Sequence, residues 1–318
     1  MTKNRPQPHF GWTWAILILL CGAVGLMPYI SWSAAGWTPR LQAFQPWMLI
    51  GVVVAVLLAS FRRRWFMAIL IMLTLILGVL PNVAAPWRQE TGAHTSEISV
   101  FSFNALKAGA DSKQLAQSIK MTNPDVLVLV ETSEPLHQRL AAEGALDALD
   151  YRSAPVPTGG EADTVIFSRY PLSQRADALG PEMTEWYGLP VVEVQAPDGP
   201  IRVVGVHLYP PLDDAQRWRS GLSALQQWAD QHNDMPMILA GDYNSTRTHP
   251  QFRQLASSME PETSWFPVPT WPTGGTLPPV VGIDHVLTRG LAPLGQHTVK
   301  IDGSDHLALT VKLGVPNK

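Results

Sequence analysis

The acidic residues of this 318-residue chain are confined to one part of it, and that distribution limits the folds open to the chain. Residues 1–86 contain no aspartate or glutamate and carry a net charge of +6. Residues 87–318 hold all 26 acidic residues against 17 basic ones, a net charge of −9. Three apolar runs fill the first part, at residues 12–30, 47–60 and 65–80. We therefore expect two units that fold in different surroundings.

The apolar runs are predicted to be transmembrane helices. The second and third are shorter than the ~20 residues that a bilayer core prefers, but Phe44, Phe61 and flanking tryptophans extend them to the interfaces. A buried helical hairpin of a soluble protein is the alternative, and a cleavable signal peptide is the alternative for the first run. The absence of charge within the runs and of a cleavage site favours a three-helix anchor over residues 1–86. Residues 87–96 are expected to form a linker, and residues 97–318 a second domain.

The basic residues predict which way the helices cross. Lys3 and Arg5 precede the first run and Arg62, Arg63 and Arg64 separate the second from the third, whereas the intervening loop has only Arg40. Because cytoplasmic loops are enriched in Lys and Arg, the N-terminus is expected inside. Three crossings then place the C-terminal domain on the extracytoplasmic side of a cell membrane.

Short polar segments follow the apolar strands that are predicted in the second domain. Glu131 ends the run Val126 to Val130, and His207 follows another apolar strand. The full set is Asn104, Glu131, His207, Gly241-Asp242-Tyr243-Asn244, Ile283-Asp284-His285 and Ser304-Asp305-His306. Metal-assisted cleavage of a phosphoester needs oxygen ligands, an imidazole and a carboxylate, and these segments supply all three.

In this order the motifs resemble the endonuclease/exonuclease/phosphatase superfamily, which has the DNase I-like fold, over roughly residues 97–315. The alternation of strands and helices by itself favours a layered α/β sandwich. The resemblance implies a four-layer α/β (α+β) sandwich of two facing mixed β-sheets flanked by helices. The site is then expected at one edge of the sheets.

The resemblance also implies roles for the residues. Glu131, Asn104 and Asp305 are the expected metal ligands, with Mg²⁺ as the ion and Mn²⁺ or Ca²⁺ as alternatives. The expected catalytic residues are His207, Asp242, Asn244, Asp284 and His306, with Asp284 orienting the imidazole of His306. Asp242 and the Asp284–His306 pair are both candidates for the general base. His285 is interpreted as structural, and Asp163 or Glu161 as the partner of His207.

An aromatic and proline-rich segment precedes Asp284. Trp265 and Trp271 lie in it, and they are interpreted as substrate-binding residues on the rim of the site. The alternative is a loop that packs on its own core.

The sequence thus predicts a membrane-anchored, divalent-metal-dependent phosphoesterase. A small or membrane-borne substrate, such as a lipid or glycolipid headgroup, is favoured, because a domain of net charge −9 lacks the basic track that nucleic acid requires. An extracytoplasmic nuclease acting on DNA or RNA is the main alternative. A non-catalytic receptor or scaffold is disfavoured because all the motifs are present.

Overall fold

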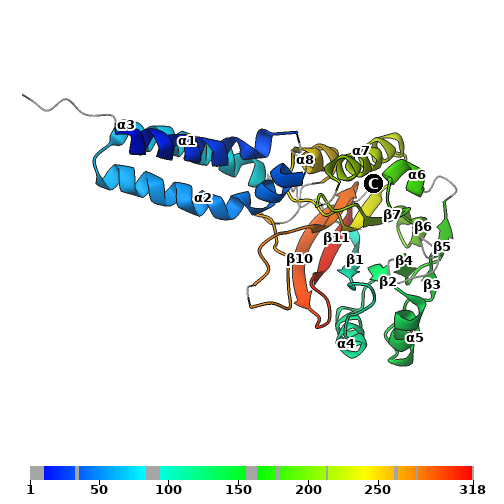
Figure 1. The fold of residues 1–318 in the computed structure, drawn as a ribbon. Helices are drawn as coiled ribbons and strands as arrows, with labels where there is room; N and C mark the ends of the chain where they lie inside the picture. The colour runs from blue at the N-terminus through cyan, green and yellow to red at the C-terminus, as the bar shows by residue number, and fades with distance from the viewer. Residues whose placement is uncertain are drawn as a thin grey trace, which may run out of the picture.

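A helical bundle and an α/β sandwich make up the protein (Figure 1). The computed structural model describes residues 11–32, 36–83, 94–154, 163–175, 179–212, 214–260, 264–276 and 278–316. Most of the predicted linker at residues 87–96 lies outside these ranges, so the domain boundaries stay a prediction.

The bundle consists of the three apolar segments. Its helices are α1 (Trp12–Leu26), α2 (Trp37–Phe61) and α3 (Trp65–Val79), with short 3₁₀ turns at Met27–Tyr29 and Leu80–Asn82. All three segments are long and apolar enough to cross a membrane. A small apolar core that includes Cys21, Val52 and Ile71 joins the helices. Arg62, Arg63 and Arg64 connect α2 to α3 at the end of the bundle that points away from the sandwich (Figure 1).

Two mixed β-sheets face each other in the sandwich. Among the described residues, one sheet has the strand order β10-β11-β1-β2-β4-β3 and the other the order β5-β6-β7-β8-β9. The first is formed by β1 (His94–Asn104), β2 (Val126–Thr132), β3 (Tyr151–Arg152), β4 (Asp163–Ser168), β10 (Ala292–Lys300) and β11 (Leu307–Pro316). The second is formed by β5 (Leu172–Gln174), β6 (Val191–Ala196), β7 (Gly199–His207), β8 (Met237–Asp242) and β9 (Asp284–Arg289). Strands β1 and β2 are parallel, as are β7 and β8.

Helices cover the outer face of each sheet. The first sheet is covered by α4 (Ser112–Thr122) and α5 (Glu134–Ala142), and the second by α7 (Ala215–Gln231) and α8 (Pro250–Ala256), with the single-turn α6 (Pro181–Thr184) beside α7. Val128, Val203 and Ile238 belong to the apolar layer between the sheets. The predicted four-layer arrangement is confirmed.

The bundle contacts the sandwich at the end that holds the start of α2. Among the described residues, six side-chain hydrogen bonds join the two parts. They are Arg40 Nη2 to Leu212 O (2.6 Å), Trp47 Nε1 to Val280 O (2.7 Å), Arg219 Nη1 to Ser31 O (3.4 Å), His249 Nε2 to Pro39 O (2.9 Å), Gln251 Nε2 to Ser31 O (3.0 Å) and Arg253 Nη2 to Pro28 O (2.5 Å). Gly36, before α2, has a φ of 84°, and a Cβ there would lie 2.5 Å from the Pro211 carbonyl oxygen. Only glycine therefore permits this close approach.

Candidate active site

Three of the predicted residues lie next to one another because of strand register. His207 ends β7 and pairs with Asp242 at the end of β8, and Asp242 pairs in turn with Asp284 at the start of β9. All three side chains are buried. The register therefore places an imidazole and two carboxylates at one edge of the second sheet.

Gly241 allows β8 to approach β7 at this edge. Its φ is 148°, and a Cβ at this position would lie 2.0 Å from the Val206 carbonyl oxygen. After the glycine, Asp242 Oδ1 accepts a hydrogen bond from the backbone N–H of Asn244 (2.8 Å). Asn244 itself is left-handed, with a φ of 47°. The Gly-Asp-x-Asn motif is thus a turn that fixes the Asp242 carboxylate.

The first sheet contributes Glu131 and Asn104. Glu131 has a φ of 51° and lies where the pairing of β2 with β4 shifts register, so its side chain leaves the regular strand direction. Asn104 Nδ2 donates to Glu131 Oε1 (3.2 Å) and to Asp242 Oδ2 (3.1 Å). Glu131 Oε1 is also 3.6 Å from His207 Nε2. These contacts join the two sheets across the site.

The turn before β11 contributes Asp305 and His306. His306 Nδ1 is 2.9 Å from Asp284 Oδ2, in hydrogen-bond contact, so Asp284 orients the imidazole. The other nitrogen, Nε2, faces Asp242 Oδ2 and Asp305 Oδ1, each at 3.8 Å. Ser304 Oγ donates to the backbone carbonyl of Asn104 (2.8 Å), which holds this turn against β1.

Burial and neighbouring charges shift the pKa values of these groups in different directions. Burial raises the pKa of Asp242 to about 7, although the charge of His306 opposes the rise. Burial lowers the pKa of His306, but the adjacent Asp284 carboxylate outweighs it and raises that pKa to about 10. Burial, followed by the charge of His306, lowers the pKa of His207 to about 3. His207 is therefore neutral at pH 7. His306 holds a proton next to the carboxylates of Asp284 and Asp242.

A cavity of about 520 Å³ opens onto these residues. Glu131, His207, Asp242, Asn244, Asp305 and His306 line one side of it. Pro39, Arg40, Ala43 and Phe44 of α2 line another. The first turns of an apolar helix therefore form a wall of the cavity that holds the predicted catalytic residues.

The oxygen-rich donor set fits a hard divalent cation. Ligand atoms of Asp242, Asp284 and His306 lie within 4.8 Å of one another. In that group, His306 Nδ1 is already in contact with Asp284, and a raised pKa disfavours an imidazole as a metal ligand. Asp305 Oδ1 is buried beside the cavity and has no hydrogen-bond partner among the described residues, and Glu131 is a second carboxylate there. Carboxylate oxygens suit Mg²⁺, Mn²⁺ or Ca²⁺.

The structure brings all eight predicted catalytic and metal-binding residues to this cavity or its immediate neighbours. Of the two predicted substrate-binding tryptophans, Trp271 lines the cavity and donates from Nε1 to Asp305 Oδ2 (2.9 Å), whereas Trp265 does not line it. His285 Nε2 contacts the Ser245 carbonyl (2.9 Å), beneath the site and in keeping with a structural role. Nδ1 of His207 has no hydrogen-bond partner in the part of the chain that is described. Asp163 is buried at the start of β4, and Glu161 lies outside the described residues.

Sequence reasoning missed several residues of the site. Tyr187 stacks on the His207 ring at 5.4 Å between centroids, and Trp186 meets the same ring edge-on at 6.1 Å. Adjacent aromatic residues in an otherwise polar loop were the available signal. Arg40 was considered only for its charge, although polar residues at the start of an apolar helix indicate a protein contact.

Comparisons with known proteins agree with this geometry. The sequence model of the endonuclease/exonuclease/phosphatase family matches residues 101–306. No curated protein matches the sequence. An endonuclease/exonuclease/phosphatase from Beutenbergia cavernae DSM 12333 is 22% identical with a TM-score of 0.54, and the alignment covers 70% of this chain and 72% of that one.

Two further solved structures have a similar fold. TDP2 from D. rerio, crystallised with a single-strand DNA product, is 16% identical with a TM-score of 0.53, over 69% of this chain and 99% of that one. A functionally unknown conserved protein from Enterococcus faecalis V583 is 15% identical with a TM-score of 0.52, over 69% and 100%. At these identities the structures share the fold of the sandwich and nothing narrower.

Proposed function

Because the chain belongs to the endonuclease/exonuclease/phosphatase family, whose members are metal-dependent phosphoesterases, it is a hydrolase of phosphoric esters, and we propose that its substrate is a membrane lipid. The observation that carries this proposal is the wall of the catalytic cavity that α2 forms with Pro39, Arg40, Ala43 and Phe44. A substrate that enters beside an apolar helix is presented by the bilayer in which that helix lies.

The metal would be held by Glu131 and Asp305, with Asn104 beside them. We propose Mg²⁺, with Mn²⁺ or Ca²⁺ as alternatives. When bound, the ion supplies a Lewis acid that polarises a phosphoryl oxygen. Asn104 also holds Glu131 and Asp242 together, since its amide nitrogen donates to both carboxylates.

The remaining residues bind the phosphoryl group and move protons. His207 is neutral and buried against Tyr187, and with Asn244 it donates hydrogen bonds to phosphoryl oxygens. Asp242 Oδ2 takes up the proton of the attacking water, and the protonated Nε2 of His306 faces this oxygen at 3.8 Å. Asp284 holds His306 in the orientation that this transfer needs.

The site is proposed to face the extracytoplasmic side. The sandwich contacts the bundle at the start of α2, whereas Arg62, Arg63 and Arg64 lie at the opposite end (Figure 1). If this basic loop is cytoplasmic, as the bias of Lys and Arg predicts, the sandwich is outside. The anchor over residues 1–86 then holds the site at the extracytoplasmic surface of the membrane.

A panel of substrates tests the proposal. The full chain in lipid nanodiscs would be incubated with Mg²⁺, Mn²⁺ or Ca²⁺ and a lipid extract, bis-aryl and mono-aryl phosphates, or plasmid DNA. We expect hydrolysis of a lipid component that stops with EDTA and depends little on salt. Cleavage of DNA that falls steeply between low and physiological salt, without lipid hydrolysis, would instead establish the nuclease alternative.

A further inference from the structure

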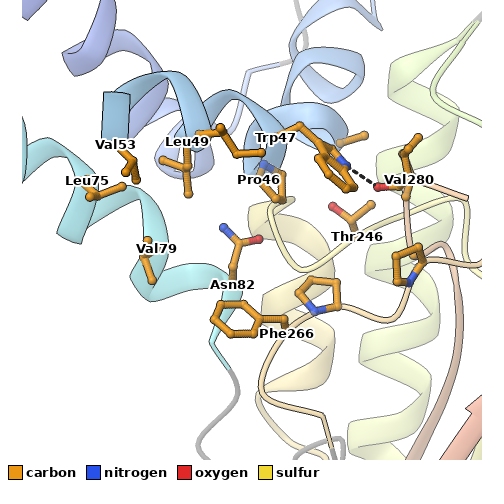
Figure 2. Close-up of a pocket in the computed structure, with 16 residues that line it drawn as sticks. Pro46, Trp47, Leu49, Val53, Leu75, Val79, Asn82, Thr246, Phe266 and Val280 are labelled. Carbon is orange, nitrogen blue, oxygen red and sulfur yellow. Dashed lines mark hydrogen bonds between the residues drawn. The ribbon is translucent and has the colours of Figure 1, made fainter. Parts of the chain in front are cut away.

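A second, apolar cavity lies beside the catalytic one, between the membrane helices and the loop at residues 264–283. Its volume is about 290 Å³. Figure 2 shows Leu49 and Val53 of α2 and Leu75 and Val79 of α3 directed toward it. We call this cavity the apolar groove. None of the described residues that line it is charged.

The loop that closes the groove is fixed to α2. Trp47 Nε1 donates to the Val280 carbonyl at 2.7 Å, and Phe266 faces the bundle from the other side of the groove (Figure 2). Phe266 and the preceding Trp265 are still 61% and 52% exposed. Exposed aromatic residues next to membrane-spanning helices are typical of the membrane–water interface, so the loop borders the bilayer.

The apolar groove adjoins the catalytic cavity. Ala43 and Val281 line both. From Ala43 the groove follows α2 to Val53, ten residues further along, a distance of about 15 Å at the rise of an α-helix. The path therefore starts beside the catalytic residues and ends at side chains of the predicted transmembrane segments.

We infer that the apolar groove binds one hydrocarbon tail of the lipid whose phosphoester lies in the catalytic cavity; this inference rests on the proposed function. The lining excludes a polyanion or a soluble headgroup as the occupant, because neither gains from an uncharged apolar surface. A tail reaches the groove without leaving the bilayer, since Val53 and Leu75 belong to the spans.

The groove contributes by orienting the lipid substrate. It does not contribute by removing apolar surface from water. A lipid tail is in hydrocarbon both before and after it binds, so its transfer yields little hydrophobic free energy. Holding the tail along α2 fixes the phosphoester relative to Asp242 and His306 and raises the effective concentration of substrate at the site.

Two phosphodiesters that differ only in the tail test the inference. Methyl p-nitrophenyl phosphate and hexadecyl p-nitrophenyl phosphate share one reaction, in which water adds to phosphorus and the bond to p-nitrophenolate breaks. The full chain in nanodiscs is compared with Val53→Trp, which fills the groove, and with Val54→Trp, the neighbouring valine that does not line it. Leu75→Trp fills the groove from the opposite wall. All proteins receive the same membrane, so partitioning of the hexadecyl ester is equal.

We expect the wild type to favour the hexadecyl ester by about tenfold or more in kcat/KM. Val53→Trp and Leu75→Trp should lower this ratio by about tenfold relative to the wild type, and Val54→Trp should keep it. A ratio that stays at the wild-type value in both groove variants would overturn the inference and leave the proposed function intact. The groove variants could also lose the preference for the hexadecyl ester because a dimer dissociates. That result would overturn the inference, since it would assign the groove to a second copy of the chain.

A binding measurement tests the groove assignment separately from the proposed hydrolysis. Hexadecylphosphonate is not hydrolysed, and its affinity is measured for the wild type and the same variants by protection against thermal unfolding. If neither ester is turned over but hexadecylphosphonate binds and Val53→Trp weakens it, the proposed function fails and the groove assignment stands. Equal affinity in wild type and Val53→Trp would contradict the groove assignment.

Discussion

Glu131 shows how a single residue links backbone conformation to chemistry. Its left-handed φ of 51° costs roughly 1 kcal/mol in a residue with a Cβ, yet it turns the carboxylate out of β2 toward Asn104 and His207. The backbone N–H of Lys107 donates to Glu131 Oε2 at 3.0 Å. The carboxylate is therefore positioned before any ion binds.

Glu131→Gln should keep the fold and lower kcat/KM by about two orders of magnitude or more, because a neutral amide is a poor ligand for a hard cation. Glu134→Gln is the matched control, since Glu134 is exposed and pairs with Arg152 at 2.9 Å. Turnover is measured with bis-aryl phosphate and the melting temperature by circular dichroism. Wild-type turnover in Glu131→Gln, or activity that survives EDTA, would rule out the metal assignment.

Gly241 is the residue whose replacement should cost most stability at the site. Gly241→Ala places a Cβ 2.0 Å from Val206 O at a φ of 148°, and we expect a loss of at least about 2 kcal/mol in unfolding free energy. Gly295→Ala is the control, because nothing lies within 4 Å of a Cβ there. Chemical denaturation measures both variants. Equal stability of the two would show that β7 and β8 do not need this close approach.

Element-scale features divide into those the sequence predicted and those it did not. Strands β2, β7 and β8 were predicted because each is a short apolar run followed by a polar residue. Strand β10 was missed, since Pro293 and Gly295 interrupt it and most of its residues are only partly buried. Helix α5 ends at Ala142, just before Gly144, whose φ is 70°.

The site itself was predictable where its residues lie at the ends of strands or match the motifs of the family. Parallel and antiparallel neighbours bring strand ends together, so His207, Asp242 and Asp284 were expected to meet. The contribution of α2 was not predictable, because the contact between Arg40 and Leu212 joins residues 172 positions apart and no local pattern encodes it.

The contact between α8 and α2 should depend on pH. His249, at the N-terminus of α8, accepts from Thr246 N–H and contacts the Pro39 carbonyl, and burial lowers its pKa from 6.5 to about 4. The unfolded state therefore binds the proton more tightly. Stability is complete above pH 6.5 and falls by about 3 kcal/mol as the pH drops to 4.

Thermal unfolding of the full chain between pH 7.5 and pH 4.5 measures this dependence. His249→Asn should show a shallower decline than the wild type, whereas replacement of the exposed His297 by Asn should leave the slope as it is. In every variant, buried His207 contributes a loss of stability as the pH falls and Asp242, whose pKa burial raises to about 7, contributes a gain, so the test is the difference between the slopes of the variants. Identical slopes for wild type and His249→Asn would contradict the assignment.

At the scale of the whole molecule, the anchor and the sandwich form one functional unit. The bundle docks on the sandwich through six side-chain hydrogen bonds among the described residues, and the start of α2 also forms a wall of the catalytic cavity. If the three helices insert into a membrane, as we propose, the cavity lies at the bilayer surface. The charge distribution, +6 in residues 1–86 and −9 in the remainder, fits a chain whose two parts lie in different surroundings.

Reporter fusions test the orientation. Alkaline phosphatase fused after Lys318 should be active, because the enzyme folds only outside the cytoplasm, and a fluorescent protein restricted to the cytoplasm should stay dark at the same position. Replacing Arg62, Arg63 and Arg64 with Gln should weaken this preference. Bright fluorescence with inactive phosphatase in the parent chain would place the sandwich inside the cell.

Lipid hydrolysis in a reconstituted bilayer tests the central claim most directly. Phosphorus NMR would follow the phosphate signals of vesicles that contain the full chain, with Mg²⁺ and then with EDTA, beside vesicles that contain Glu131→Gln. The account predicts that one lipid phosphate signal is converted to a product signal only in the wild type with the ion. Unchanged lipid signals, in a preparation that cleaves plasmid DNA under the same conditions, would contradict it.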